Sequence, residues 1–210
     1  MNKFLIFVGV AFLSSSFAAN IPPEPKWRLQ SFLDMVVAQP DQLLKDADAY
    51  FKTEHLKEAS EDPKFVHEWQ DRLAIVRSLS FFFDPAQHHI NHHQRSNARR
   101  LIEKAMIEDP ALVVRDGAVE ALRMIFRMRP YETKQWQRIL EKAFADKKNI
   151  VGREGLFIRE TILTTMREGS LHPSKRMDRI ARRDRNPEVQ RLLGLWDTRA
   201  FSMVPKALRK

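Results

Sequence analysis

The chain has 210 residues, of which 43% are hydrophobic and 30% charged, so it is long and apolar enough for one domain with a real core. The absence of cysteine excludes disulfides, thiol catalysis, cysteine-based zinc sites and iron–sulfur clusters. Only six glycines occur and no segment alternates convincingly at period two, so we expect an all-α fold without a sheet. The formal net charge of +9 favours acidic partners, although a basic surface can also serve solubility alone.

Residues 1–18 have the features of a secretory signal peptide. Lys3 is followed by an apolar run from Phe4 to Leu13 and by the small-x-small sequence Ser16-Phe17-Ala18. The run is too short for a bilayer span, which needs about 20 residues. We therefore predict cleavage and a periplasmic or secreted protein without a membrane span. A retained anchor or a buried first helix is the alternative interpretation.

Residues 19–26 are rich in proline and are predicted to form an extended lead. Helical apolar spacing starts at Trp27, and residues 27–83 are predicted to be divergent N-terminal helices that cap the fold. Within them Pro40 ends one helix and Asp41 is expected to cap the next.

Residues 84–97 form a histidine-rich connection that contains His88, His89, His92 and His93. If this segment is helical, the histidines make two i,i+4 pairs that could hold one zinc, nickel or copper ion. Asp84 is the nearest acidic residue, and no third ligand is evident. A polar loop between repeats and a pH-responsive cluster are the alternatives.

Residues 98–200 contain an internal repeat with a period of about 38 residues. Val and Arg recur together at Val113 and Arg115, at Val151 and Arg153, and at Val189 and Arg191. The preceding helices share five apolar positions, which are Ala98, Leu101, Ile102, Ala105 and Met106 in one copy and Trp136, Ile139, Leu140, Ala143 and Phe144 in the next. The third copy keeps Met177 and Ala181. Each unit therefore reads as helix, short turn, helix.

The turn Asp109-Pro110, followed by Val114-Arg115, Gly117-Ala118 and Ala121-Leu122, resembles a HEAT repeat. Asn186-Pro187-Glu188-Val189-Gln190 resembles the same motif, with Gln190 in place of the arginine and a slip of one position in register. The resemblance covers about half the chain. It implies a right-handed α-solenoid of stacked antiparallel helix pairs, which usually serves as a binding platform, and it implies no reaction.

Arg115, Arg153 and Arg191 open two interpretations. The HEAT resemblance implies a structural ladder in which such an arginine bonds the turn acid, here Asp109, Asp146 or Asp184, and ties neighbouring layers together. An anion-binding ladder is the functional alternative.

The resemblance also places the second helix of each pair on the concave side. One of these helices carries the polar stripe Asp116, Glu120, Arg123 and Arg127. One period later the same face holds Glu154, Thr161 and Thr165, and a further period on it holds Trp196 and Arg199. The face becomes more apolar toward the C-terminus. Either the basic tail, residues 201–210, folds over it, or Trp196 anchors a partner there.

Catalytic motifs are absent from the sequence, which has no Gly-rich phosphate loop, no Gly-x-Ser-x-Gly elbow and no His-Glu-x-x-His. We therefore predict a non-enzymatic scaffold that needs no cofactor and binds a protein or another acidic partner on its concave face, with no nucleic acid expected. A metal-binding or pH-sensing protein that uses His88, His89, His92 and His93 is the first alternative, and an enzyme on a HEAT-like scaffold is the second.

Overall fold

The computed structural model describes residues 26–54, 56, 68–149 and 152–197. The predicted signal peptide, most of the proline-rich lead, Arg199 and the C-terminal tail lie outside these ranges. Over the described residues the chain forms helices and no strand, which confirms the predicted all-α class. None of the helices within them has the length and apolar character needed to cross a bilayer.

The N-terminal part comprises α1 (Lys26–Ala38), α2 (Pro40–Tyr50), α4 (Trp69–Leu79) and the 3₁₀ turn η2 (Ser80–Phe83). The central part comprises α5 (His92–Glu108), α6 (Leu112–Met128), η3 (Pro130–Glu132), α7 (Lys134–Ala145) and η4 (Lys147–Asn149). The C-terminal part comprises α8 (Gly152–Glu168), α9 (Lys175–Arg182) and α10 (Pro187–Asp197).

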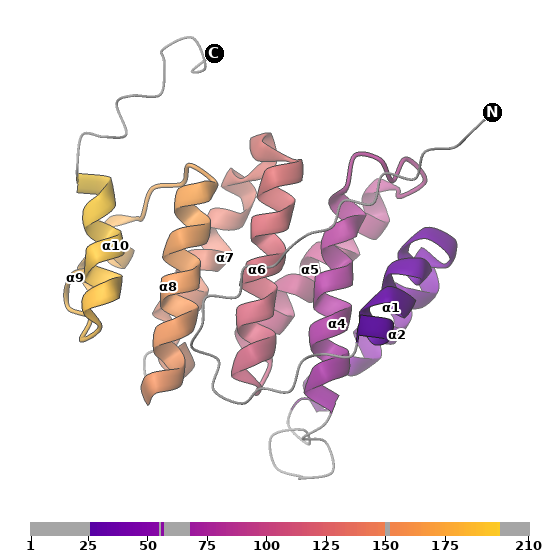
Figure 1. The fold of residues 1–210 in the computed structure, drawn as a ribbon, viewed down its shortest axis with the longest axis horizontal. Helices are drawn as coiled ribbons and strands as arrows, with labels where there is room; N and C mark the ends of the chain where they lie inside the picture. The colour runs from indigo at the N-terminus through magenta and orange to yellow at the C-terminus, as the bar shows by residue number, and fades with distance from the viewer. Residues whose placement is uncertain (1–25, 55, 57–67, 150–151, 198–210) are drawn as a thin grey trace.

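The helices lie in two layers. Helices α4, α6, α8 and α10 stand side by side in one layer, and α5, α7 and α9 lie behind them in the other (Figure 1). Along the chain α5 packs against α6, α7 against α8, and α9 against α10. At the N-terminal end α1 packs against α4, and α2 packs against α5.

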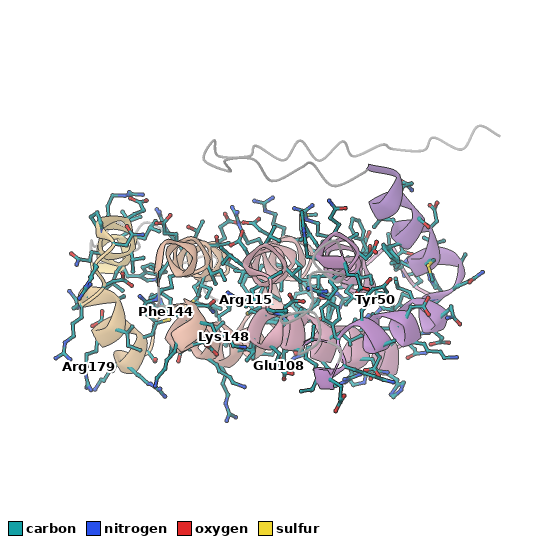
Figure 2. All side chains as sticks on the ribbon, turned by 90° about the horizontal axis from the view of Figure 1, so that it is seen from below. Tyr50, Glu108, Arg115, Phe144, Lys148 and Arg179 are labelled. Carbon is teal, nitrogen blue, oxygen red and sulfur yellow. The ribbon has the colours of Figure 1, made fainter. Side chains whose placement is uncertain are left out.

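The core lies between the two layers and is built from the apolar positions that recur in the sequence. Four of the five such residues in α7 are fully buried, namely Trp136, Leu140, Ala143 and Phe144, and Ile139 packs against the core. The matching residues of α5, together with Met177 and Ala181 of α9, are buried as predicted. Figure 2 shows Phe144 and Arg115 between the layers. One apolar stripe per helix thus accounts for the packing of each layer on the other.

Local signals set several helix ends. Asn91 caps α5, because its side chain accepts a hydrogen bond from the Gln94 backbone N–H at 2.9 Å while the Gln94 side chain accepts one from the Asn91 backbone. The expectation that Asp41 caps α2 is wrong. Pro40 occupies the first turn of that helix, as proline prefers, and Gln39 is the N-cap. Asp41 instead accepts a hydrogen bond from the Gln94 amide at 2.8 Å, which joins α2 to α5.

Candidate functional site

The stripe predicted on α6 meets α8 through a network of ion pairs. Arg123 donates to Glu120, one turn before it on α6, at 2.8 Å, and also to Glu168 near the end of α8. Arg127 donates to the other carboxylate oxygen of Glu168 at 3.3 Å. Burial alone would raise the pKa of Glu168, but the hydrogen bond from Arg123 and the charges of both arginines hold it below its ordinary value. The charges of this face therefore compensate one another.

Asp116 occupies the same face one turn earlier on α6. Its carboxylate receives a hydrogen bond from Thr161 of α8, and its Oδ1 is buried without a hydrogen-bond partner in the described structure. Burial raises the pKa of Asp116 to about 6, against the opposing effect of Thr161. Thr165 is fully buried, so it packs between helices and offers nothing to a partner. These residues hold α6 to α8.

The positions of two other side chains predicted on this face are not described. Glu154 lies on α8, but its side chain is not among those described, and Arg199 lies outside the described residues. Trp196, on α10, lies in a different environment that is described below. Where the predicted partner face is described, its charged residues pair between α6 and α8, and Arg127 remains exposed.

Arginines do bind the turns between helices, but only one of the three predicted arginines, Arg115, is seen to do so. Arg115 does reach its own turn, but it donates to the backbone carbonyls of Asp109 and Pro110, at 2.7 and 2.9 Å. Its Nε donates to Asn149, in the turn before α8, at 3.1 Å. The carboxylate of Asp109 is instead held by Arg72 of α4 at 2.7 Å.

Further along the chain, Arg159 of α8 pairs with the buried Asp184 in the turn before α10, and its guanidinium lies 4.5 Å from the ring centroid of Phe144. Arg191 does not reach Asp184, because it is exposed and pairs with Glu188 on the surface of α10. The Arg153 side chain is not described. Asp146 uses its carboxylate for the backbone N–H of Lys148 at 2.8 Å.

Among the described residues, Arg72, Arg115 and Arg159 are therefore the buried arginines that bind the turn of the next helix pair. They stand 43 and 44 positions apart, a spacing that differs from the 38-residue repeat. Sequence reasoning missed Arg72 and Arg159 because it followed the shorter period. The spacing of the three arginines was a signal that could have revealed them.

The histidines do not form the expected pairs on one helix. His88 and His89 lie in the turn before α5, while His92 and His93 begin that helix as adjacent residues. His89 Nε2 lies 3.2 Å from the carbonyl oxygen of Val36, and His93 contacts Asn97. In the described part of the chain, no three or more His, Cys, Asp or Glu side chains are grouped to hold a metal ion.

A groove of about 600 Å³ opens between α9 and α10 at the C-terminal end of the fold. We call it the α9–α10 groove. Its cationic wall contains Lys175, Arg179 and Arg183, which follow one another at intervals of four residues. Its apolar wall contains Leu193 and Trp196 of α10. The remaining lining residues are His172, Pro173, Asp178 and Arg182.

The apolar wall of this groove has a fixed geometry. The indole Nε1 of Trp196 donates to the carbonyl oxygen of Leu171 at 3.0 Å, and the ring packs against the core. Leu193 is buried, so only part of its side chain reaches the groove. Trp196, which the sequence suggested as an anchor, therefore lies beside cations that were not singled out.

A second groove, of about 460 Å³, lies between α7 and α9. We call it the α7–α9 groove. Arg138 and Lys142 line it from α7, and Arg176 lines it from α9. Glu141 also lines it, but its carboxylate already accepts hydrogen bonds from Gln137 and from the backbone of Ser174.

Both grooves belong to a strongly basic region. The segment 172–185 contains six basic residues, Lys175, Arg176, Arg179, Arg182, Arg183 and Arg185, and two aspartates. Asp184 is buried under Arg159, and Asp178 pairs with Arg182. Within the described ranges, no carboxylate lies in ion-pair distance of Lys175, Arg176, Arg179, Arg183 or Arg185. We call these five residues the basic end, and Figure 2 shows Arg179, one of them, at the C-terminal end of the described fold.

Sequence reasoning did not select the basic end, although the run Lys-Arg-x-x-Arg-x-x-Arg-Arg-x-Arg from position 175 was visible. The run alone does not show which carboxylates of the folded chain pair with these basic side chains. Comparison of the chain with protein-family models, with curated proteins and with solved structures finds no match.

Proposed function

We propose that this chain is an exported, non-enzymatic scaffold of HEAT-like repeats that binds an acidic protein partner at its basic end. The features of residues 1–18 support export. Support for a right-handed α-solenoid comes from the recurring aspartate turn and from the helix pairs α5–α6, α7–α8 and α9–α10. A platform of this kind binds through an exposed surface.

The observation that carries the proposal is a contrast between two cationic surfaces. On α6 the arginines are already bound to Glu120 and Glu168, so an acidic partner would have to displace a carboxylate of the chain itself. On α9 and directly after it, the exposed cations of the basic end have no such competitor among the described residues. Charge complementarity at a surface of this kind steers encounter and selects partners of opposite sign.

The recurring turn is stabilised by hydrogen bonds of its aspartate. Asp109, Asp146 and Asp184 each accept a hydrogen bond from the backbone N–H two residues later, at 2.8 to 2.9 Å. Arg72 and Arg159 then bind two of these aspartates from the preceding pair. Hydrogen bonds of this kind preorganise a surface, and preorganisation lowers the entropic cost of association.

The test is a pull-down from periplasmic extract with the chain lacking residues 1–18 as bait, at low and at moderate ionic strength. We compare the wild type with R176E/R179E, which reverses one cation in each groove, and with K45E/K52E. Lys45 and Lys52 are exposed near the other end of the fold, so both variants change the net charge equally.

We expect the wild type and K45E/K52E to recover the same acidic protein and R176E/R179E to lose it. Rebinding of the purified partner to the purified chain then establishes a direct contact, and its affinity should fall as salt rises. Recovery of no protein at either ionic strength would overturn the proposal. Equal loss in both variants would show that net charge, and not the basic end, governs retention.

A further inference from the structure

The geometry of the α9–α10 groove points to an extended peptide segment in which acidic residues alternate with apolar residues. This inference rests on the proposed function, because it names the part of the acidic partner that the scaffold would bind. The inference depends on the two walls of the groove, of which one is cationic and the other apolar.

The cationic wall has a regular spacing. Lys175, Arg179 and Arg183 are exposed and lie at i, i+4 and i+8, so they form one line along α9 that ends at its C-cap residue, Arg183. A rise of about 1.5 Å per residue places successive Cα atoms on this line about 6 Å apart along the helix axis. In an extended chain, residues i and i+2 point to the same side and are separated by about 6.6 to 6.8 Å. Every second residue of an extended segment can thus meet one cation.

The apolar wall can bind the peptide residues that lie between the acidic ones. Side chains of an extended segment alternate between two sides, so acids that face α9 leave their neighbours facing α10. There the segment meets the partly exposed ring of Trp196 beside Leu193. A tryptophan held by a hydrogen bond offers a large apolar contact at little cost in conformational entropy.

Charge also favours an acidic occupant of this groove. The exposed cations Lys175, Arg179 and Arg183 attract an acidic segment from another protein. Asp178, the one carboxylate in the lining, is bound to Arg182 and so does not neutralise the line of three cations.

The experiment is calorimetric titration of the chain without residues 1–18. The main probe is a short end-blocked peptide in which glutamate alternates with leucine. Its control is an isomer of the same composition with contiguous glutamates, and oligothymidylate is the third probe. We expect the alternating peptide to bind about tenfold more tightly than its isomer, because only the alternating order satisfies both walls.

Two matched variants locate the site. R179Q/R183Q removes two cations of the α9–α10 groove and should weaken the alternating peptide about tenfold or more. R138Q/R176Q removes two cations of the α7–α9 groove and should leave the affinity within about twofold. Trp196→Ala should bring the affinity for the alternating peptide close to that for the isomer, with circular dichroism and thermal melting used to verify folding.

Equal affinity for the two peptides, equal losses in the two double variants, or tighter binding of oligothymidylate would each overturn the inference. If neither peptide binds while the pull-down still recovers an acidic protein through the basic end, the groove assignment fails and the proposed function stands. If the alternating peptide binds as expected while the pull-down recovers nothing, the groove assignment stands and the scaffold proposal fails.

Discussion

The guanidinium Nε of Arg72 lies 2.7 Å from Oδ2 of Asp109, and the two side chains are only 2% and 0% exposed although 37 residues separate them. Arg72 belongs to α4, and Asp109 forms the turn before α6, where its Oδ1 also accepts the backbone N–H of Ala111 at 2.8 Å. One carboxylate thus shapes its own turn and joins it to the preceding helix. The pair of Arg159 and Asp184 has the same arrangement two turns further along.

Replacing Asp109 by alanine should lower the free energy of unfolding by about 3 to 5 kcal/mol, because Arg72 is then left buried without its counter-charge. Urea denaturation followed by circular dichroism measures this change. Glu188→Ala, which breaks the exposed pair with Arg191, is the control and should cost about 0 to 1 kcal/mol. Similar losses for the two variants would show that the buried pair has no special role.

Asp116 should make stability depend on pH. Its pKa is raised to about 6 in the folded chain from the ordinary 3.8, so between these values the folded chain binds more protons than the unfolded chain. The free energy of unfolding therefore falls as pH rises from about 4 to about 6. Asp116→Asn should remove this decline and stabilise the fold at pH 7 by about 2 to 3 kcal/mol. Urea titrations from pH 4 to 8 measure the slope, and an unchanged slope in the variant would contradict the assignment.

Ser170 has φ of 54°, the left-handed conformation, at the end of α8. There the backbone N–H of Leu171 binds the carbonyl of Met166 and that of Ser170 binds Arg167, the pattern of a helix end that favours glycine. Ser170→Gly should raise the melting temperature, because the free energy of unfolding should rise by about 1 kcal/mol. Gly169→Ala is the counterpart, because the added Cβ would lie 2.6 Å from the Phe126 ring and should destabilise by about 1 to 3 kcal/mol. A loss of stability on Ser170→Gly would refute this description of the helix end.

The cap of α5 gives a further prediction. Asn91→Ala removes the acceptor for the Gln94 backbone N–H and should cost about 1 kcal/mol, as measured by thermal or urea unfolding. Asn97→Ala changes the same residue type inside that helix, where the amide lies within hydrogen-bond distance of His93, and should change the free energy of unfolding by no more than about 0.5 kcal/mol. If the two changes cost the same, the capping box does not stabilise α5.

The sequence alone determined the all-α class, the aspartate turns and the apolar stripes that are buried on α5 and α7. These features are local. A stripe at helical spacing, such as the one from Trp136 to Phe144, must be covered because exposing it to water is costly. An aspartate such as Asp109 can bind the backbone two residues later whatever surrounds it.

Only the tertiary structure decided which charges meet. Arg159 reaches Asp184 and Arg191 does not, since the outcome depends on how far α8 is displaced along its axis and rotated relative to the next turn. Residue spacing within one helix does not specify these quantities. The same reason explains why the arginines of α6 are neutralised by Glu120 and Glu168 while Lys175 and Arg179 remain open to solvent. A partner site for an acidic protein is set by the charges that remain after folding has paired the rest.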